Sequence, residues 1–314
     1  MSLVANSEFY PNGQCRLTFH CNLCGTRNDL LAKHYENPEL PSCSQCSSNV
    51  RFRWLVHRLS RELFANSLPL CQFPADKSIC GLGLTDPAPL AAVLTERFTY
   101  LNTYLDMEPR LDIRYDPSPI GPLDFLIASE VFEHVEPPVV EAFRNAARLL
   151  KPSGFLLLTV PWVWDGDAQS ALLEFYDWKL DRDENRWVIV NRNPDGQVDR
   201  FYDPSFDGSP GPSLGHTREH FPELFDWKLS DEEGSLRLRN RRRDGTSEVF
   251  HNLVFHGGPG LALEMRLFTR ADIANSLHAA GFRSVEFDNR EVCESGIVFP
   301  YAWSHPIVAR KAGP

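Results

Sequence analysis

The sequence predicts an α/β protein with a doubly wound, mostly parallel sheet, and one stretch of the chain carries most of that prediction. The runs DFLIAS (124–129) and FLLLTV (155–160) are apolar without alternation, as expected of strands buried on both faces. Pro152 and Gly154 are expected to end a helix that lies between these strands. Its apolar residues at helical spacing are Val139, Ala142, Phe143, Ala146, Leu149 and Leu150. Strand, helix and strand in this order form a βαβ crossover.

The ends of the two strands predict where a ligand binds. In open α/β sheets, ligands bind in the crevice outside the carboxyl ends of the strands. Residues 129–134 and 161–164 directly follow the two strands, so we expect them to line one crevice. The first of these segments carries Glu130, Glu133 and His134.

Four motifs in a set order resemble a known family, the class I S-adenosylmethionine-dependent methyltransferases with a type 11 or type 12 domain. IASEVFEHV followed by RLLKPSGFLLLTVP resembles the family's fourth strand, acidic motif, helix and fifth strand. SICGLGLTD (78–86) resembles its first strand and glycine loop, and RLDI (110–113) its adenine-contacting acidic position. Residues 265–289 resemble the helix and strand that close the fold. The resemblance implies a Rossmann-like sheet of seven strands that binds S-adenosylmethionine.

The glycine loop departs from the family pattern at two positions. The pattern has an acidic residue two positions before the first glycine and a further glycine four positions after it, where this chain has Ile79 and Thr85. Glycine still allows the backbone to approach a ligand closely. The residues expected to do so are Gly81, Leu82 and Gly83.

Asp86 bears on the choice of cofactor. It either supplies a carboxylate to the methionine ammonium or caps the following helix. A nicotinamide fingerprint needs GxGxxG and an acid about 20 residues later, but Asp86 replaces the third glycine and no acid lies between Glu96 and Asp106. A ligand with an ammonium and a sulfonium tolerates carboxylates that disfavour a pyrophosphate. The acids expected at the crevice, which favour S-adenosylmethionine, are Asp86, Asp112, Glu130 and Glu133.

The resemblance implies further cofactor contacts. Asn102 is the polar candidate at the family's ribose-binding position, where an amide can hydrogen-bond a hydroxyl without a charge. Asp112 is expected to accept a hydrogen bond from the adenine amino group, with Ile113 packed on the ring. A solvated carboxylate is the alternative for Asp112. Ser129 and Glu130 are expected to face the cofactor.

Candidates for proton transfer follow the strand end. Methyl transfer from a sulfonium needs an in-line nucleophile, and positioning and desolvation supply most of the acceleration. If the acceptor arrives protonated, His134 is the candidate base, with Glu130 as a second catalytic candidate. A structural role for His134 at the start of a helix is the alternative.

Four of the eight cysteines form a metal-binding pattern. Cys21-Asn-Leu-Cys24 and Cys43-Ser-Gln-Cys46 make a CxxC…CxxC pair, and four thiolates at this spacing can close a tetrahedral site around one zinc ion. A closed four-sulfur site has no open position for chemistry, so the prediction is a structural zinc ribbon. Disulfides or a bound iron are the alternatives. The other cysteines are interpreted as buried or incidental thiols: Cys15, Cys71, Cys80 and Cys293.

A connecting helix and a linker are expected after the ribbon. One apolar face at helical spacing is expected to pack on the next domain; it comprises Phe52, Leu55, Val56, Leu59, Leu63 and Phe64. Residues 69–76, with two prolines and no periodicity, are the expected linker. A basic cluster raises nucleic-acid binding as an alternative to packing or a substrate-lid role; it comprises Arg51, Arg53, Arg58 and Arg61.

Residues 162–264 are too long for a loop and predict a β-rich insertion that shapes the acceptor site. RWVIVNRNPDGQVDRFY and SLRLRNRRRDGTSEVFHNLVF each place Asp-Gly between strand-like runs and predict two hairpins. The second carries a set of arginines, interpreted as a strand edge guarded by charge or as a site for an anionic acceptor: Arg237, Arg239, Arg241, Arg242 and Arg243. Aromatic residues that either stack on an acceptor or fill a small core are Trp162, Trp164, Tyr176 and Trp178.

One metalloprotease-like pattern is discounted. His216-Thr-Arg-Glu219-His220 matches HxxEH, which requires a continuous helix to bring both histidines to one metal. Glycines and prolines in residues 208–215 and Pro222 leave little room for such a helix. No catalytic metal is therefore expected there.

Composition excludes several functional classes. The net charge of −10 argues against a nucleic-acid partner, because phosphate binding needs clustered Lys and Arg. The longest apolar stretch, residues 155–164, is shorter than the ~20 residues that span a membrane. Residues 1–15 lack the features of a signal peptide, so we expect a cytoplasmic protein.

The parts of the 314-residue chain are expected to serve one reaction. The expected divisions are a zinc ribbon (1–50), a connecting helix and linker (51–76), the first part of the methyltransferase core (77–161), the insertion as an acceptor-site cap (162–264), and the C-terminal part of the core (265–314). The predicted function is methyl transfer from S-adenosylmethionine to a small-molecule or glycan-like acceptor. The alternative is a catalytically degenerate protein of this fold whose ribbon recruits a protein or nucleic acid. The sequence carries no indication of oligomeric state.

Overall fold

The structure is a computed structural model in which two compact units can be described separately. It describes residues 15–31, 40–105, 107–115, 117, 120–135, 139–163, 268–299 and 305–313, and in residues 7–9 and 177–263 it describes the strands named below. The first unit comprises Met1–Val131, Arg144–Val160 and Leu277–Pro314, and the second comprises Phe132–Phe143 and Pro161–Ser276.

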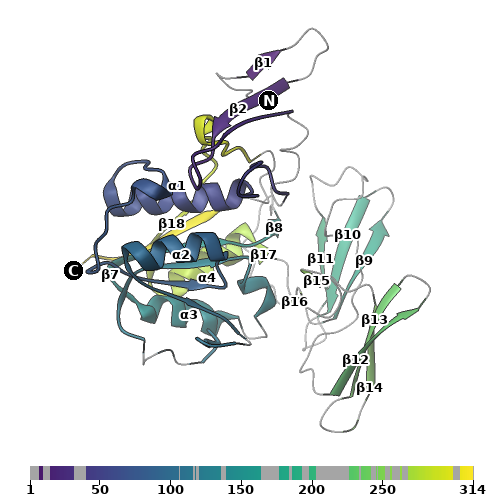
Figure 1. The fold of residues 1–314 in the computed structure, drawn as a ribbon. Helices are drawn as coiled ribbons and strands as arrows, with labels where there is room; N and C mark the ends of the chain where they lie inside the picture. The colour runs from purple at the N-terminus through teal and green to yellow at the C-terminus, as the bar shows by residue number, and fades with distance from the viewer. Residues whose placement is uncertain are drawn as a thin grey trace. The chain divides into compact units, whose positions relative to one another are not determined.

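A six-stranded sheet forms the centre of the first unit (Figure 1). Its strand order is β18-β19-β7-β6-β4-β5, with β4 to β7 parallel and β19 antiparallel to both of its neighbours. The mostly parallel sheet is therefore confirmed, and six of the expected seven strands lie in the described part of the chain. The strands are β4 (Cys80–Leu84), β5 (Thr99–Thr103), β6 (Leu123–Ser129), β7 (Leu150–Thr159), β18 (Phe282–Phe287) and β19 (Ile307–Lys311).

The predicted βαβ crossover is present, but its second strand begins earlier than expected. Helix α3 (Val140–Leu149) leads directly into β7, so Leu150 belongs to the strand. Pro152 and Gly154 lie inside β7, not in a loop before it. Ser153 between them has a φ of 65°, and the β6–β7 register shifts between Leu123 and Phe125. The segment that stops the helix is thus an irregular first part of the strand.

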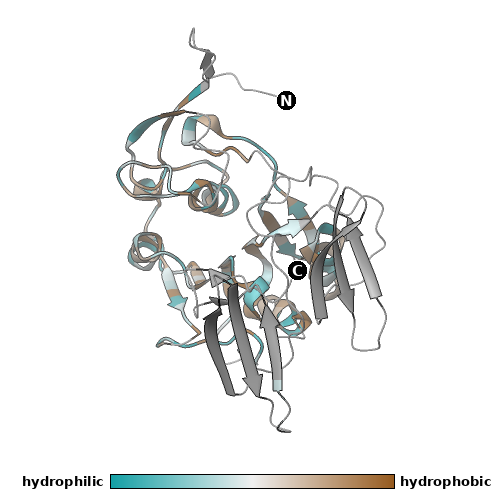
Figure 2. Cartoon of the chain, turned by 90° about the vertical axis from the view of Figure 1, so that its right-hand side faces the viewer, coloured by the Kyte–Doolittle hydropathy of each residue, from teal (hydrophilic) through white to brown (hydrophobic). Residues whose placement is uncertain are grey.

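Helices α1 (Val50–Phe64) and α2 (Ala88–Arg97) share one hydrophobic core with the sheet. Asn49 begins α1 by accepting a hydrogen bond from the Phe52 N–H at 3.0 Å. The apolar face predicted for this helix packs into the core and confirms the expected packing. Its fully buried members are Leu55, Val56 and Leu59, and those partly buried are Phe52, Leu63 and Phe64. Figure 2 shows hydrophilic and hydrophobic residues alternating along the helices.

The opposite side of α1 is tied to the last strands by ion pairs. Glu62 binds Arg310 at 2.6 Å, and Arg58 lies 3.1 Å from Glu286. Asp288 accepts a hydrogen bond from the Trp54 indole at 3.0 Å. The helix that follows the cysteines is therefore a fixed part of the first unit. The expected linker, residues 69–76, is packed as well: it contains a short 3-10 helix (Leu70–Gln72), and its buried residues are Leu70 and Phe73.

Elements of the second unit include short paired strands and the start of a helix. β8 (Trp162–Val163) pairs in parallel with β17 (Phe268–Thr269), which leads into α4 (Arg270–Ala279). The Trp162 side chain is buried. α4 and β18 confirm the helix and strand expected at the end of the fold.

The insertion forms two three-stranded antiparallel sheets and a two-stranded one, and both predicted hairpins are confirmed. Arg237, Arg239 and Arg241 lie on β13, the middle strand of its sheet, so the interpretation as a guarded strand edge is wrong for these three residues. The strands are β9 (Asp177–Asp183), β10 (Arg186–Arg192), β11 (Val198–Tyr202), β12 (Asp226–Glu232), β13 (Ser235–Arg241), β14 (Ser247–His251), β15 (Phe255–His256) and β16 (Ala262–Leu263).

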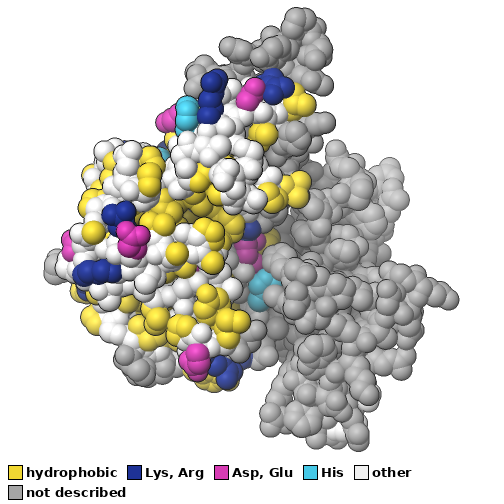
Figure 3. All heavy atoms as spheres, in the orientation of Figure 1, with side chains coloured by type: hydrophobic (Ala, Val, Ile, Leu, Met, Phe, Trp, Pro, Cys, Tyr) yellow, Lys and Arg dark blue, Asp and Glu magenta, His cyan; other side chains and the backbone are white. Residues whose placement is uncertain are grey.

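Some sequence predictions fall outside the described residues. They are the HxxEH pattern at 216–220, the aromatic residues Trp164 and Tyr176, the arginines Arg242 and Arg243, and the side chains of Cys15 and Trp178. Among the helices that the structure describes, none combines the length and apolar character needed to cross a membrane. On the face seen in Figure 3, the charged side chains of described residues are scattered among hydrophobic and uncharged ones.

Candidate functional site

The two CxxC turns adopt the same backbone geometry. An antiparallel sheet of β1 (Ser7–Phe9), β2 (Cys15–His20) and β3 (Arg27–Leu31) leads into and out of the first turn. The N–H of Gly25 donates to the Cys21 carbonyl at 2.7 Å, and the N–H of Ser47 donates to the Cys43 carbonyl at 3.0 Å. Both donors have positive φ, 79° and 55°. Each CxxC turn is thus closed by one residue in the left-handed conformation. Gly25 adopts this conformation freely, whereas for Ser47 it is unfavourable.

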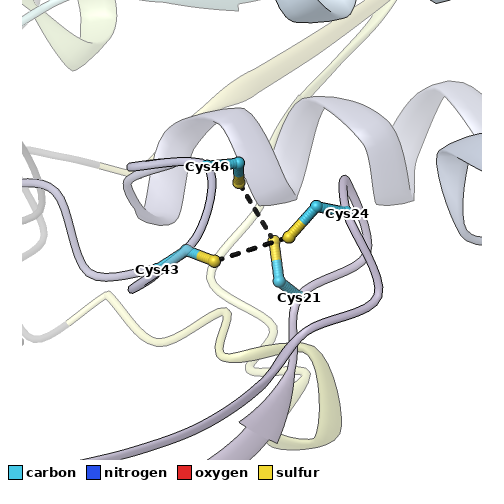
Figure 4. Close-up of side chains that lie close together, drawn as sticks. All are labelled: Cys21, Cys24, Cys43 and Cys46. Carbon is cyan, nitrogen blue, oxygen red and sulfur yellow. Dashed lines mark hydrogen bonds between the residues drawn. The ribbon is translucent and has the colours of Figure 1, made fainter.

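The four cysteine sulfurs converge on one point between these turns (Figure 4). All four Sγ atoms lie within 4.8 Å of one another. The Sγ atoms of Cys21 and Cys46 are 3.7 Å apart, and those of Cys24 and Cys43 are 3.6 Å apart. A tetrahedral zinc site with metal–sulfur bonds of ~2.3 Å has sulfur–sulfur edges of about 3.8 Å. The donor set and its spacing therefore fit a four-coordinate zinc ion.

Polar groups around the sulfurs orient them. The Ser48 hydroxyl lies 3.3 Å from Cys21 Sγ, and the Asn28 amide donates to Cys43 Sγ at 3.6 Å. Burial raises the pKa of the Cys21 thiol. Burial opposes ionisation of Cys43 too, but N–H groups of Cys46 and Gln45 lower the pKa of its thiol to about 6. Such donors to sulfur are what a thiolate cluster requires.

The arginines that follow the second CxxC turn point inward. Arg51, Arg53 and Arg58 are all buried. Arg53 is fully buried; it donates to the Gly296 carbonyl at 2.9 Å and lies over the Phe19 ring at 4.7 Å. The alternative of nucleic-acid binding needs these charges at the surface, so it is not supported for these three residues.

The glycines of the expected loop, Gly81 and Gly83, lie within β4, and packing inside the protein requires them. A Cβ at Gly81 would collide with the Phe125 ring, and a Cβ at Gly83 would collide with the Tyr100 hydroxyl and the Asp86 carboxylate. Leu82, between them, is fully buried. The sequence predicted that this backbone approaches a ligand, whereas here its glycines make room for side chains of neighbouring strands.

Asp86 is the acid at the end of this loop, and it lies in the interior. Its side chain is buried and accepts a short hydrogen bond from the Tyr100 hydroxyl. Burial raises the pKa of the Asp86 carboxyl to about 7, and the bond from Tyr100 opposes the rise. Its other oxygen, Oδ1, is buried without a hydrogen-bond partner among the described residues. An orphaned buried acceptor at a strand end is the observation here that best fits a bound ammonium. The helix-cap alternative is not realised, because Pro87 occupies the N-cap of α2 and no side chain caps it.

Asn102 holds the loop closed. Its Oδ1 accepts from the Asp86 N–H and its Nδ2 donates to the Asp86 carbonyl, both at 2.9 Å. Nδ2 also donates to the Tyr104 hydroxyl at 3.0 Å. The amide thus uses most of its hydrogen-bonding capacity within the protein.

Thr85 keeps a backbone conformation that suits glycine. It stands at the family's third glycine position and has a φ of 62°. Its N–H donates to the Thr103 carbonyl at 2.8 Å. A β-branched residue in this region is a strained exception. The loop has therefore lost the glycine but kept the geometry.

Asp112 and Ile113 are placed by a local turn. Asp112 accepts from Arg114 Nη2 at 2.6 Å and from the Arg114 backbone N–H at 3.1 Å. Burial tends to raise the pKa of the Asp112 carboxyl, but the bonds from Arg114 hold it below its usual value. Ile113 is buried, and its carbonyl accepts from Asn145 of α3 at 2.9 Å. Asp112 is thus bonded to Arg114, which does not match the alternative of a carboxylate bound only by solvent.

Ser129 ends β6, Glu130 directly follows it, and both are bonded to β7. The Ser129 and Thr159 hydroxyls are 2.9 Å apart, and the Glu130 N–H donates to the Thr159 carbonyl at 2.8 Å. Glu130 has a φ of 54°. Its Oε1 lies 2.8 Å from Nη1 of Arg51. The acid at the strand end is therefore held from two sides.

His134 and Glu133 belong to the second unit. They form a 3-10 helix, Phe132–His134, in which Glu133 is fully buried. The His134 Nε2 lies 3.5 Å from Oε1 of Glu133. Phe132 packs on Phe143 with ring centroids 4.8 Å apart. The side chain of Glu133, one of the acids expected at the crevice, is therefore buried in the interior of this unit.

Tyr100 and Arg51 are the residues that sequence reasoning missed. Both engage a predicted site acid, Asp86 and Glu130 respectively. Arg51 was visible only as part of a basic cluster, and Tyr100 only as an aromatic residue in a strand. Neither pattern indicates which acid is contacted.

One segment of the sequence matches a known family of methyltransferase domains. Residues 111–158 match the family described as "Methyltransferase domain". This segment contains β6, α3 and most of β7. No curated protein matches the chain. The chain therefore contains a segment whose sequence matches a methyltransferase domain.

Several solved structures are similar at low identity. A sugar N-methyltransferase from a Streptoalloteichus species is 12% identical, with 82% of this chain and 86% of that chain covered and a TM-score of 0.38. An amino pentose methyltransferase from Micromonospora echinaspora, solved with S-adenosylmethionine bound, is 15% identical over 74% of this chain and 84% of that chain, with a TM-score of 0.34. DesVI from Streptomyces venezuelae is 13% identical, with 74% of this chain and 84% of that chain covered and a TM-score of 0.35.

Proposed function

We propose that this methyltransferase transfers the methyl group of S-adenosylmethionine to a small-molecule or glycan-like acceptor by in-line displacement. The observation that carries the proposal is the match of residues 111–158 to the methyltransferase domain. That segment supplies two adjacent parallel strands of the central sheet, and ligands of such sheets bind beyond the carboxyl ends of the strands.

The cofactor would be held by residues at those strand ends. The unpartnered Oδ1 of Asp86 is the proposed acceptor for the methionine ammonium, because a buried carboxylate oxygen gains most from a cationic donor. Asp112 and Ile113 are the proposed adenine contacts, and Asn102 the ribose contact. The remaining proposed cofactor-binding residues are Gly81, Leu82, Gly83, Ser129 and Glu130.

Bound S-adenosylmethionine supplies an electrophilic methyl group, so the protein has to position the acceptor and exclude water. His134 is the proposed base for an acceptor that carries a proton, and Glu130 the second candidate. The two sheets of the insertion, residues 162–264, are the proposed cap over the acceptor.

The four cysteines are proposed to bind one structural zinc ion. The four sulfurs would complete its coordination, so this ion would order the segment that leads into α1 and take no part in chemistry. The proposal places the enzyme in the cytoplasm, because a reducing compartment keeps cysteines available as metal ligands.

A second candidate is favoured by a specific observation. Asn102, Asp112 and Glu130 already have partners inside the protein, and the Tyr100 hydroxyl fills the space in front of Gly83. A catalytically degenerate protein of this fold, whose zinc ribbon recruits a protein or nucleic acid, would have these features.

Calorimetric titration separates the two candidates. The full chain is titrated in parallel with S-adenosylmethionine, S-adenosylhomocysteine and NAD. We expect micromolar binding of the first two and none of NAD. Absence of binding by all three would reject the enzyme and support the scaffold. Asp86→Asn is the informative variant, because it removes the proposed ammonium partner and preserves side-chain volume.

A further inference from the structure

Arg51 connects the four-cysteine cluster to the acid at the end of β6. Helix α1 begins four residues after Cys46, and Asn49 caps its first turn. Arg51 is the second residue of the helix, and its Nη1 lies 2.8 Å from Oε1 of Glu130. The side chains of this ion pair are 10% and 15% exposed. The pair is therefore largely removed from water, where its geometry matters more than at a surface.

Glu130 adopts a conformation that needs support. Its φ of 54° is left-handed, a conformation that is unfavourable for a residue with a Cβ. The Glu130 N–H reaches the Thr159 carbonyl at 2.8 Å from this conformation. Its carboxylate is held by Arg51. Strained residues persist where the surroundings over-determine them, and these two contacts do so here.

The same helical turn is fixed on its other side by the cysteine turns. Arg53 donates to the Ser48 carbonyl and to the Ser42 hydroxyl, both at 2.8 Å. The Ser48 hydroxyl lies 3.3 Å from Cys21 Sγ. The first turn of α1 thus contacts the sulfur cluster through Arg53 and the strand end through Arg51. A shift of this turn would disturb both.

We propose that Arg51 is a positioning residue through which the four-cysteine cluster sets the backbone and carboxylate of Glu130. As far as the cofactor is concerned, this rests on the proposed function, because Glu130 is one of the proposed cofactor-binding residues. The cluster then does more than fold its own segment: it determines the shape of the strand end that faces the cofactor.

Hydrogen exchange tests the link without any ligand. Arg51→Gln should accelerate exchange of the Glu130 N–H by about tenfold, and Arg51→Lys should accelerate it less, because lysine retains the charge. Cys46→Ser should reproduce the Arg51→Gln effect at Glu130. Arg16→Gln is the control. It breaks an exposed ion pair with Asp29 between β2 and β3, the strands beside the first cysteine turn, and should not change exchange at Glu130.

Unchanged exchange at Glu130 in Arg51→Gln, or a Cys46→Ser effect no larger than the control, would overturn the proposal. Glu130→Gln removes the ion pair without altering α1, so the test survives if Arg51→Gln does not fold. The same acceleration of exchange at the Glu130 N–H is expected for that variant.

Affinity for S-adenosylhomocysteine provides the second readout. Arg51→Gln and Glu130→Gln should each weaken binding by about tenfold, and the double variant should be no weaker than Glu130→Gln alone, because Arg51 acts through Glu130. Additive losses would contradict that route. If the unaltered protein binds no S-adenosylhomocysteine, the proposed function fails, while hydrogen exchange still decides the positioning role of Arg51.

Discussion

The Tyr100 hydroxyl donates a hydrogen bond to the buried Asp86 carboxylate at the end of β4, in the space that a side chain at position 83 would need. The other carboxylate oxygen of Asp86 has no hydrogen-bond partner among the described residues, so these residues satisfy only half of the carboxylate. Burial raises the pKa of Asp86 to about 7. The carboxyl group is thus in a state that pH or a cationic ligand can change near neutrality.

The first prediction concerns the pH dependence of stability. Because the folded-state pKa of Asp86 is raised from 3.8 to about 7, the folded protein holds a proton that the unfolded chain releases between about pH 4 and pH 7. This contribution to stability is present below pH 4 and is lost as pH rises through 7, by up to about 4 kcal/mol. Asp86→Asn should remove the loss, as measured by urea unfolding at pH 5 and pH 8.

Asp76→Asn is the control for that measurement, because Asp76 is exposed and the hydrogen bonds described for its side chain come only from Ser78. It should leave the difference between pH 5 and pH 8 unchanged. If the unaltered protein and the Asp86→Asn variant lose the same free energy of unfolding between pH 5 and pH 8, the raised pKa of Asp86 is contradicted.

The second prediction uses the strain at Thr85. Thr85→Gly should raise the free energy of unfolding by about 1 kcal/mol, because glycine adopts the left-handed conformation without the steric strain of a β-branched side chain. Thr95→Gly is the matched control: Thr95 is exposed inside α2, and glycine there should destabilise by roughly 0.5 kcal/mol. Thermal or urea unfolding checks both. Destabilisation by Thr85→Gly would show that the strain is absent.

The sequence predicted those features that depend on local patterns. The βαβ crossover follows from apolar runs and helical spacing, and the cysteine turns follow from two CxxC motifs whose backbone repeats itself. The left-handed turn at Thr85 could be placed only by alignment with a family glycine. These features need no knowledge of distant neighbours.

The partners of the site acids could not be predicted. Arg51 and Glu130 are 79 positions apart, and their pairing depends on how α1 packs against the sheet. Tyr100 is a β-strand residue by its pattern, and nothing in that pattern indicates that its hydroxyl reaches Asp86. The middle position of β13 was missed for the same reason, because strand order is a property of the whole sheet.

The third prediction concerns the metal. The full chain should contain one zinc ion, and Cys43→Ser should lose it, because three sulfurs bind zinc much more weakly than four. Cys71→Ser is the control, since Cys71 is an exposed thiol outside the cluster. Elemental analysis of purified protein measures the metal content. Full zinc retention by Cys43→Ser, or loss by Cys71→Ser, would contradict the assignment of the four ligands.

The last prediction concerns Asp288, which joins α1 to the C-terminal strands. It accepts from the Trp54 indole at 3.0 Å and from Arg290 at 2.8 Å, and Arg58 lies 3.4 Å away. Burial works against ionisation, but these partners hold the pKa of Asp288 below its usual value. Such a carboxylate stabilises the fold above the pKa of the unfolded chain, and the contribution is lost as pH falls through the folded-state pKa.

Asp288→Asn should therefore cost up to about 3 kcal/mol near pH 7, because it removes a buried carboxylate that faces the buried Arg58 and accepts hydrogen bonds from Trp54 and Arg290. The difference from the unaltered protein should start to shrink as pH falls below about 4, where the unfolded chain begins to bind the proton, and should be lost as pH falls through the lowered folded-state pKa. Glu96→Gln serves as the control, since Glu96 is exposed and pairs only at 3.5 Å with Arg97. A destabilisation by Asp288→Asn that stays constant from pH 7 to a pH below the folded-state pKa would mean that shape, not charge, accounts for the role of Asp288.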